Sequence, residues 1–280
     1  MRARNQFEQS RRTRGRRDLP DVPVPLRVAL LVMILAGACT DTRHPITEER
    51  IPLQVGSTTV EVVIHTASRP GFTYINLHDD ENTAVEAALQ VVEVLGGRVI
   101  ELQHTGRRNV RFELGDSTFA FDPNRIFTPN GLDSTLARQS RPSRAAADVV
   151  SAFADSLLEI IGLSELSTVV AVHNNTENGY SALQYADAGP LAADAHSVHL
   201  SEGADADDFF FVTSPEVYQD LRAADFNVVM QDNEGVTDDG SLSVLCGRLG
   251  IPYVNAEAQH GHLEEQVRML LLLQRVLSGR

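Results

Sequence analysis

The sequence has no lysine and no tryptophan, and it has only two cysteines among its 280 residues. Two cysteines cannot build a disulfide framework, and a chain of this length buries enough surface to fold without one. No apolar run approaches the roughly 20 residues that a membrane-spanning helix needs. The phosphate loop G-x-x-x-x-G-K-[ST] and the nucleophile elbow G-x-S-x-G are both absent, which argues against P-loop nucleotide hydrolysis and serine-hydrolase chemistry.

The charge is distributed unevenly along the chain. Eight of the 24 basic residues, all of them arginine, precede residue 39, whereas from Cys39 onward 35 acidic residues face 16 arginines, a formal charge of −19. Such an excess of negative charge repels polyanions. We therefore expect neither nucleic acid nor an anionic membrane surface as a partner of the folded part.

The arginine-rich start is followed by an apolar segment of eleven residues, 28–38. A basic region, a short apolar region and small residues before a cleavage point are typical of an export signal. We therefore predict a signal peptide over 1–38 and an exported protein. Residues 35–39 (Leu-Ala-Gly-Ala-Cys) resemble the bacterial lipobox, although Ala36 stands where leucine is usual. This favours a lipoprotein of the periplasm or cell envelope, lipidated at Cys39, with plain secretion as the alternative.

Residues 39–56 contain Pro45 and Pro52 among polar residues and are predicted to be a tether, followed by one domain over 57–280. In that domain, strand and helix patterns alternate. The expected strands and helices are the segments 60–66, 73–77, 83–95 (helix), 98–102, 118–121, 144–161 (helix), 168–172, 209–213, 216–224 (helix), 228–230, 241–249 (helix), 252–256 and 262–277 (helix). This order predicts a single α/β domain with a mostly parallel or mixed central sheet flanked by helices.

Polar residues follow three of the apolar strands. In open α/β sheets, functional side chains gather at the carboxyl ends of strands. His78 and Glu81 lie three residues apart at a strand-to-helix turn, and His173 ends a neighbouring strand. Two histidines and one carboxylate that leave a coordination position open are typical of a catalytic zinc site. The alternative is that His78 caps the following helix.

The segment 121–127 (Phe-Asp-Pro-Asn-Arg-Ile-Phe) adds a further motif. With it, the chain resembles the zinc metallocarboxypeptidase superfamily, which includes carboxypeptidase A-like enzymes and the succinylglutamate desuccinylase and aspartoacylase group. In that superfamily a His-x-x-Glu pair, an Asp-Pro-Asn-Arg segment, a strand-end histidine and a late glutamate occur in this order. Ile126 departs from the usual asparagine. The resemblance covers about residues 60–277 and implies a zinc carboxypeptidase-like fold.

The resemblance also implies roles for individual residues. His78, Glu81 and His173 would bind zinc, and Glu257 would act as the general base. Arg107 or Arg108 would stabilise the developing oxyanion, and the sequence does not decide between them. Asn124 and Arg125 would bind a substrate carboxylate, because a guanidinium group gives such a group two parallel hydrogen bonds; the alternative for Arg125 is a structural ion pair. A tyrosine is also expected near the substrate, with Tyr180, Tyr185, Tyr218 and Tyr253 available.

Other histidines and the second cysteine receive structural interpretations. His196 and His199 are expected in an exposed loop beside acidic residues, and His260 and His262 near a helix start or behind a ligand. Cys246 is expected to be a buried, unreactive thiol.

The sequence thus predicts an exported zinc-dependent hydrolase that cleaves an amide bond next to a free carboxylate in a peptide, including cell-wall peptides. Two alternatives remain open: a deacylase that acts on N-acyl amino acids, and a lipid-anchored binding protein that has the same fold without catalysis. The expected partner is a peptide or acyl-amino-acid substrate, and contact with a membrane is expected only through the N-terminal lipid.

Overall fold

The computed structural model describes residues 43–279. The predicted signal peptide, the cleavage point and Cys39 lie outside the described residues. Among residues 43–279, no helix is both long and apolar enough to cross a bilayer.

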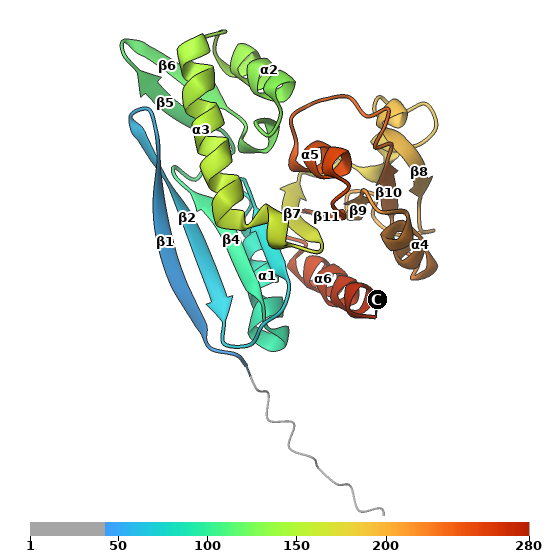
Figure 1. Cartoon of the computed structure of the whole chain (residues 1–280). Helices are drawn as coiled ribbons and strands as arrows, with labels where there is room; N and C mark the ends of the chain where they lie inside the picture. The colour runs from blue at the N-terminus through green and yellow to red at the C-terminus, as the bar shows by residue number, and fades with distance from the viewer. Residues whose placement is uncertain (1–42, 280) are drawn as a thin grey trace, which may run out of the picture. The chain divides into compact units, whose positions relative to one another are not determined.

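Nine strands form one mixed sheet in the order β1-β2-β4-β3-β7-β11-β9-β10-β8 (Figure 1). The pairs β3/β4, β3/β7, β7/β11 and β9/β10 are parallel, and the other neighbours are antiparallel. Strands β5 and β6 form a separate antiparallel pair. The strands are β1 (Ile46–Val55), β2 (Thr58–Ala67), β3 (Thr73–Asn76), β4 (Arg98–Gln103), β5 (Val110–Leu114), β6 (Ser117–Phe121), β7 (Val169–Asn175), β8 (Ala195–His199), β9 (Phe209–Val212), β10 (Val228–Gln231) and β11 (Tyr253–Gln259).

Helices cover both faces of the sheet and bury a core on each side (Figure 1). Side chains of α2, α3 and α5 join the core on one face, and those of α1, α4 and α6 join the core on the other. The helices are α1 (Asn82–Leu95), α2 (Pro129–Gln139), α3 (Arg144–Ile161), α4 (Pro215–Ala223), α5 (Leu242–Leu249) and α6 (Leu263–Ser278), with short 3₁₀ turns η1 (Pro123–Arg125), η2 (Leu163–Glu165), η3 (Ala182–Tyr185) and η4 (Ala192–Asp194). The predicted single α/β domain with a mixed sheet flanked by helices is confirmed.

Local signals explain where the longest helix lies. The Ser143 side chain accepts a hydrogen bond from the Ala146 backbone N–H at the start of α3, and Gly162 ends the helix in the left-handed conformation. Serine at the N-cap and glycine after the last turn are the residues that these positions favour. Between them, the buried residues recur at helical spacing, so the helix packs one face on the sheet.

The prediction of a tether over 39–56 is wrong for residues 46–55, which form β1. This strand pairs with β2 along its whole length, from Ile46 opposite Ala67 to Val55 opposite Thr58. Its apolar residues alternate, and Val55 is fully buried. Pro52 suggested a tether, but proline is tolerated in an edge strand because the missing N–H needs no partner on the open side.

Three further segments differ from the expectation. Strand β5 and helix α2 were not predicted, and together with β6 they lie beside α3 (Figure 1). The segment with His196 and His199, expected to be a loop, is the edge strand β8. His199 Nε2 lies 3.2 Å from Asp225 Oδ1, an acid outside the run 202–208 that was expected beside these histidines.

Candidate metal centre and active site

Three adjacent parallel strands carry the central residues of the site. His78 lies two residues beyond the end of β3, His173 belongs to β7, and Glu257 belongs to β11 directly opposite His173. Glu81 is the N-cap residue of α1, which follows β3. Because β3, β7 and β11 are neighbours, residues almost 180 positions apart in sequence meet at the carboxyl edge of the sheet.

The predicted ligand atoms converge on one point. His78 Nδ1 lies 2.7 Å from Glu81 Oε1, and His173 Nδ1 lies 2.7 Å from Glu81 Oε2. The two Nδ1 atoms are 3.1 Å apart. All three residues are buried, with exposed fractions of 4% or less.

This donor set fits a zinc ion. Two imidazole nitrogens and one carboxylate are the ligand types that zinc takes at catalytic sites. Nitrogens that each lie about 2.1 Å from a tetrahedral zinc would be roughly 3.4 Å apart, close to the separation of the two Nδ1 atoms. A bound zinc ion would also explain why His78 Nδ1 and His173 Nδ1 face each other, because both nitrogens could then bind the same cation.

Asp122 links the ligand set to an arginine. Its Oδ1 lies 2.9 Å from His78 Nε2, so the carboxylate orients the imidazole whose other nitrogen faces the site. Its Oδ2 accepts a hydrogen bond from Arg108 Nε at 3.1 Å, and Arg108 Nη1 donates to Glu81 Oε1 at 2.8 Å. Asp122 opens the Asp-Pro-Asn-Arg segment, but no sequence pattern indicated its role.

Three buried amide side chains hold the surrounding backbone. Asn76 Nδ2 donates to the Val172 carbonyl at 2.9 Å, which joins β3 to β7. Asn174 Oδ1 accepts a hydrogen bond from the Ala84 N–H at 2.8 Å and so fixes the first turn of α1. Gln266 of α6 donates to the His173 carbonyl at 3.0 Å. No sequence motif assigns these contacts, because each joins residues that are far apart in the sequence.

Burial and mutual charge set the protonation of the cluster. Burial disfavours the charged forms, but Glu81 and Asp122 outweigh it at His78 and raise its pKa to about 9. Burial likewise opposes ionisation of Glu81, yet His78 and His173 lower its pKa. The pKa of His173 is lowered, mainly by burial. The cluster therefore keeps Glu81 ionised and His173 neutral, the forms that bind a metal.

Glu257 lies beside this cluster and is 4% exposed. Burial and the negative charge of Glu81 raise the pKa of its carboxyl group to about 8. One oxygen, Oε2, accepts a hydrogen bond from Asn255 Nδ2 at 2.8 Å. A divalent cation bound by the neighbouring residues would favour the ionised form of Glu257, because a nearby opposite charge lowers a carboxyl pKa.

A cavity of about 740 Å³ contains the candidate site. Its lining includes His78, Glu81, His173 and Glu257 together with three further predicted residues, Arg108, Asn124 and Arg125. Of the two arginines between which the sequence did not decide, Arg108 thus lines the cavity, whereas Arg107 is exposed and does not.

The predicted carboxylate-binding pair has partners of its own. Asn124 Oδ1 accepts a hydrogen bond from the Leu242 N–H at 3.0 Å, and its Nδ2 lies 3.5 Å from His173 Nε2. Arg125 donates from Nη1 to the Asn124 carbonyl, and its Nε lies 3.4 Å from Asp239 Oδ2. One edge of the Arg125 guanidinium group is therefore already shared with an acid.

Three of the four tyrosines considered from the sequence line the cavity, namely Tyr180, Tyr185 and Tyr253. The hydroxyl groups of Tyr180 and Tyr185 are 2.6 Å apart. Tyr218 instead packs in the core on the opposite face.

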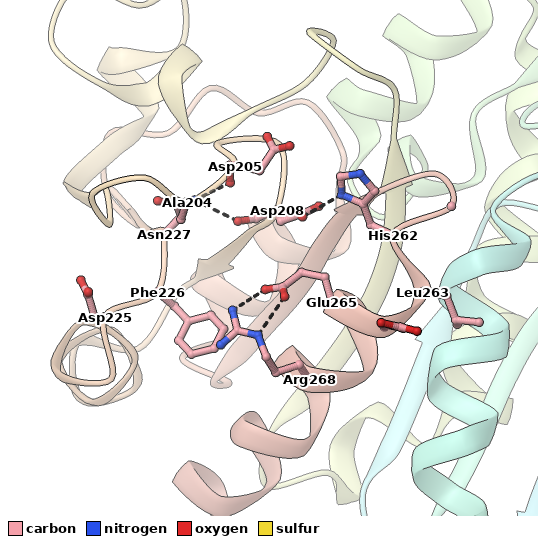
Figure 2. Close-up of a pocket in the computed structure, with 12 residues that line it drawn as sticks. Ala204, Asp205, Asp208, Asp225, Phe226, Asn227, His262, Leu263, Glu265 and Arg268 are labelled. Atoms are coloured by element: carbon pink, nitrogen blue, oxygen red, sulfur yellow. Dashed lines mark hydrogen bonds and ion pairs between the residues drawn. The ribbon is translucent and has the colours of Figure 1, made fainter.

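A second group of metal-ligating side chains lies elsewhere, formed by Asp205, Asp208 and His262 (Figure 2). His262 Nδ1 lies 2.8 Å from Asp208 Oδ2, and Asp208 Oδ1 accepts a hydrogen bond from the Gln259 N–H at 2.9 Å. Asp205 Oδ1 accepts from the Asp207 N–H. These contacts connect the turn before β9 to the start of α6. His262 is the N-cap residue of α6, which agrees with its predicted position near a helix start. His260, by contrast, lines the cavity that contains the candidate site.

The second cysteine has the expected environment. Cys246 is fully buried in α5, and burial raises the pKa of its thiol to about 12. It is therefore an unreactive core residue.

No family model matches the sequence, and no curated protein matches it. Solved structures of similar fold include a succinylglutamate desuccinylase/aspartoacylase from Rhodobacter sphaeroides (16% identity, TM-score 0.42, covering 87% of this chain and 68% of that one). A second is a murein-tripeptide amidase from Escherichia coli O157 (11% identity, TM-score 0.42, covering 83% of this chain and 92% of that one). A third is thrombin-activatable fibrinolysis inhibitor (12% identity, TM-score 0.46, covering 84% of this chain and 70% of that one).

The similarity of the chain to these three structures concerns the fold alone. All of these identities are low and all TM-scores are below 0.5, so the function has to be inferred from the side chains of the site.

Proposed function

We propose that this protein is a zinc-dependent hydrolase that cleaves an amide bond next to a free carboxylate, as a metallocarboxypeptidase does. The observation that supports this most directly is the convergence of His78 Nδ1, His173 Nδ1 and the Glu81 carboxylate beside a second buried carboxylate, Glu257. Neither a structural zinc site nor an ordinary ion-pair network needs that second acid in a cavity of about 740 Å³.

A zinc ion held by His78, Glu81 and His173 would polarise the scissile carbonyl and lower the pKa of a water molecule beside it. Glu257 accepts the proton of the attacking water and delivers it to the leaving amine, which is the role of a general base that becomes a general acid. Arg108 directs its guanidinium group to the carbonyl oxygen as negative charge develops there. Its own ion pairs with Glu81 and Asp122 hold that group at the edge of the cluster.

Arg125 and Asn124 bind the free carboxylate of the substrate, since both line the cavity and Arg125 is only partly engaged by Asp239. The same machinery would serve a C-terminal peptide bond and the amide of an N-acyl amino acid. A panel of dipeptides and N-acyl amino acids, assayed side by side, distinguishes the two substrate types.

The first test is the metal content of the purified chain, measured by elemental analysis after extensive desalting for the wild type and for His78→Ala. We expect near-stoichiometric zinc in the wild type and none in the variant. Absence of zinc from the wild type, also after reconstitution, would contradict the proposal and leave a non-catalytic binding protein of the same fold.

We also propose that the protein is exported and lipidated at Cys39, with cell-wall peptides as the substrates that this location offers. The basic and apolar segments before Cys39 support this. Labelling with a radioactive fatty acid in a bacterial host should mark the wild type and not Cys39→Ala. Label in both proteins, or in neither, would contradict lipidation at this residue.

A further inference from the structure

The first turn of α1 is capped differently from the first turns of four other helices. In α2, α3, α4 and α5, the side chain of the N-cap residue accepts a hydrogen bond from the backbone N–H three positions later, the usual arrangement at a helix start. These N-cap residues are Thr128, Ser143, Ser214 and Ser241. The N-cap residue of α1 is Glu81, and its side chain makes no such bond. The N–H three positions later, that of Ala84, therefore needs a different side-chain acceptor.

Both carboxylate oxygens of Glu81 are engaged in the candidate metal site. Oε1 lies 2.7 Å from His78 Nδ1 and 2.8 Å from Arg108 Nη1, and Oε2 lies 2.7 Å from His173 Nδ1. A carboxylate that turned back to accept the Ala84 N–H would leave this position. For Glu81 to serve as a metal ligand, another group has to cap α1.

Asn174 of β7 supplies this cap. Its Oδ1 accepts a hydrogen bond from the Ala84 N–H at 2.8 Å, shorter than the 3.2 Å from the same nitrogen to the Glu81 carbonyl. Asn174 directly follows His173 in the strand. The helix that begins at one predicted ligand is therefore tied to the strand that carries another.

Gln266 of α6 extends this connection. Its Nε2 donates to the carbonyl of His173 at 3.0 Å and to that of Ala256 at 3.2 Å, and its Oε1 accepts a hydrogen bond from Asn174 Nδ2 at 3.0 Å. A flipped amide would place its oxygen against two carbonyl oxygens, so these contacts fix the orientation of the group. One buried side chain thus joins α6 to β7 and β11.

The backbone on both sides of Glu257 is held by the two amides. Gln266 binds the carbonyl of Ala256, and Asn174 Nδ2 donates to the carbonyl of Ala258 at 3.1 Å. The general base proposed above therefore lies between two carbonyl groups whose positions are set from β7 and α6. A single hydrogen-bonded pair reaches the elements that carry the predicted ligands and the base.

The pair occupies a place where apolar residues would complete the core. Val170 and Val172, which share a strand face with Asn174, lie in the core that α1, α4 and α6 cover. Asn174 is 5% exposed and Gln266 is fully buried. Asn174 lines the cavity, but its oxygen and nitrogen are both used by protein groups. Buried amides of this kind add little net stability, so their value lies in what they position.

We propose, as a refinement that depends on the proposed hydrolase function, that Asn174 and Gln266 are positioning residues of the zinc site. Asn174 caps α1, which leaves the Glu81 carboxylate free to bind the metal. Gln266 joins this cap to the carbonyl of His173 and to the carbonyl that precedes Glu257, which holds the ligands in place relative to the general base. Both residues act through the groups that they hold and not through contact with the substrate.

The first measurement is the zinc affinity of the purified chain, by competition with a chelator of known affinity. Asn174→Ala should weaken it by about 10- to 100-fold, the usual cost of losing a partner that orients a metal ligand. Gln266→Met removes the connection from the α6 side with little change in volume, and it should weaken the affinity by about tenfold, the lower end of that range. If Asn174→Ala does not fold, Gln266→Met decides the test.

Asn227→Ala is the matched control. Asn227 is 2% exposed and, like Asn174, makes three hydrogen bonds: its Oδ1 accepts from the Ser201 N–H, and its Nδ2 donates to the carbonyls of Asp205 and Asp208. It does not line the cavity that contains the candidate site. The control should keep the wild-type zinc affinity even where urea unfolding without metal shows an equal loss of stability. Equal losses of zinc affinity in both asparagine variants would overturn the proposal.

Kinetics at saturating zinc distinguish positioning from substrate binding. For Asn174→Ala we expect kcat to fall by about tenfold or more, because small displacements of reacting groups are costly. KM should stay close to the wild-type value, since Asn124 and Arg125, the proposed carboxylate-binding pair, are unchanged. A higher KM with unchanged kcat would place Asn174 in substrate binding and overturn its positioning role.

The same measurements tell the failure of this proposal from the failure of the hydrolase proposal. A wild type that binds no zinc overturns both, because there is then no metal site to position. A wild type that binds zinc, with the same affinity in Asn174→Ala and Gln266→Met, overturns only the positioning roles and leaves the hydrolase proposal intact.

Discussion

Two clusters in this protein contain the same residue types and differ in what surrounds them. The His78–Glu81–His173 cluster is buried at the carboxyl edge of three neighbouring strands, and its ligand atoms face one another beside Glu257. In the Asp205–Asp208–His262 cluster (Figure 2), Asp205 is exposed. One carboxylate oxygen of each acid accepts a hydrogen bond from a backbone N–H group. Each cluster could hold an ion by distance alone.

Ligand atoms that lie close together are therefore weaker evidence for a metal site than ligand atoms whose hydrogen-bond partners do not explain their position. Asp208 and His262 satisfy each other and stabilise a chain connection, so no cation is needed to explain them. In the buried cluster, two imidazole Nδ1 atoms face each other at 3.1 Å, an arrangement that a shared cation explains.

The largest expected effect is on metal binding. His173→Ala should abolish stoichiometric zinc binding and turnover, because it removes one of three ligands and catalytic zinc sites have three protein ligands. His262→Ala should bind zinc and hydrolyse substrate as the wild type does. Elemental analysis of both variants, with circular dichroism to verify folding, checks this. Loss of zinc in His262→Ala with retention in His173→Ala would reverse the assignment of the two clusters.

Glu257→Gln should lower kcat by about 10²- to 10⁴-fold, the usual contribution of a general acid–base group. Zinc content should stay at the wild-type level, because Glu257 is not among the three ligands. The amide keeps the size of the side chain. Steady-state kinetics together with metal analysis measure the effect, and full activity in this variant would rule out Glu257 as the base.

Asp122→Asn should weaken zinc affinity by about 10- to 100-fold, because the carboxylate that orients the His78 ring and raises its basicity is lost. Competition with a chelator of known affinity measures the change. Asp79→Asn is a control of the same charge, since Asp79 Oδ2 binds the His104 and Gly106 N–H groups and not a ligand. An equal loss of affinity in both variants would point to general electrostatics instead of ring orientation.

The fold was largely predictable from the sequence, because periodicity reports burial. The amphipathic α3 was expected at its observed bounds, 144–161. The apolar part of β7 was also expected, over 168–172, but the strand continues through polar residues to Asn175. Strand β1 was missed because only one face of an edge strand is buried, so its pattern (Ile51, Leu53, Val55) is short and Pro52 interrupts it. Helix α2 was missed because most of its residues are polar, and Leu132 and Leu136 are its only residues in the hydrophobic core.

The candidate site was predictable where motifs carry the residues, and less so where contacts cross the sheet. His78, Glu81 and His173 could be proposed together because strand ends meet at one edge. The choice between Arg107 and Arg108 depends on which side chain turns inward in a loop, and no periodicity encodes that. Asp122, Asn174 and Gln266 contact His78, Ala84 and His173, which are 44 to 93 positions away. Single-sequence patterns do not predict such pairs.

Zinc affinity should rise with pH by up to about tenfold per unit below pH 9. Glu81 and Asp122 outweigh burial and raise the pKa of His78 to about 9, so near neutral pH a metal has to displace a proton from this ring. Calorimetry in buffers of different ionisation enthalpy would detect the released proton. Binding that does not change between pH 6 and 8 would mean that His78 is neutral before the metal binds.

The smallest expected effect concerns the His262–Asp208 pair, which is partly exposed. The hydrogen bond to Asp208 outweighs burial and raises the pKa of His262 above its usual 6.5. The folded state therefore binds the proton more tightly than the unfolded state, and the contribution of the charged pair is complete below about pH 6.5 and is lost as pH rises through the folded-state pKa. His262→Gln should thus lower the free energy of unfolding by at most about 1 kcal/mol at pH 6 and by less at pH 9. Urea unfolding of both proteins at the two pH values, without added metal, measures this difference. If the pair instead formed a cation site, added zinc would stabilise the wild type more than it stabilises His262→Gln. The two clusters would then no longer differ in function.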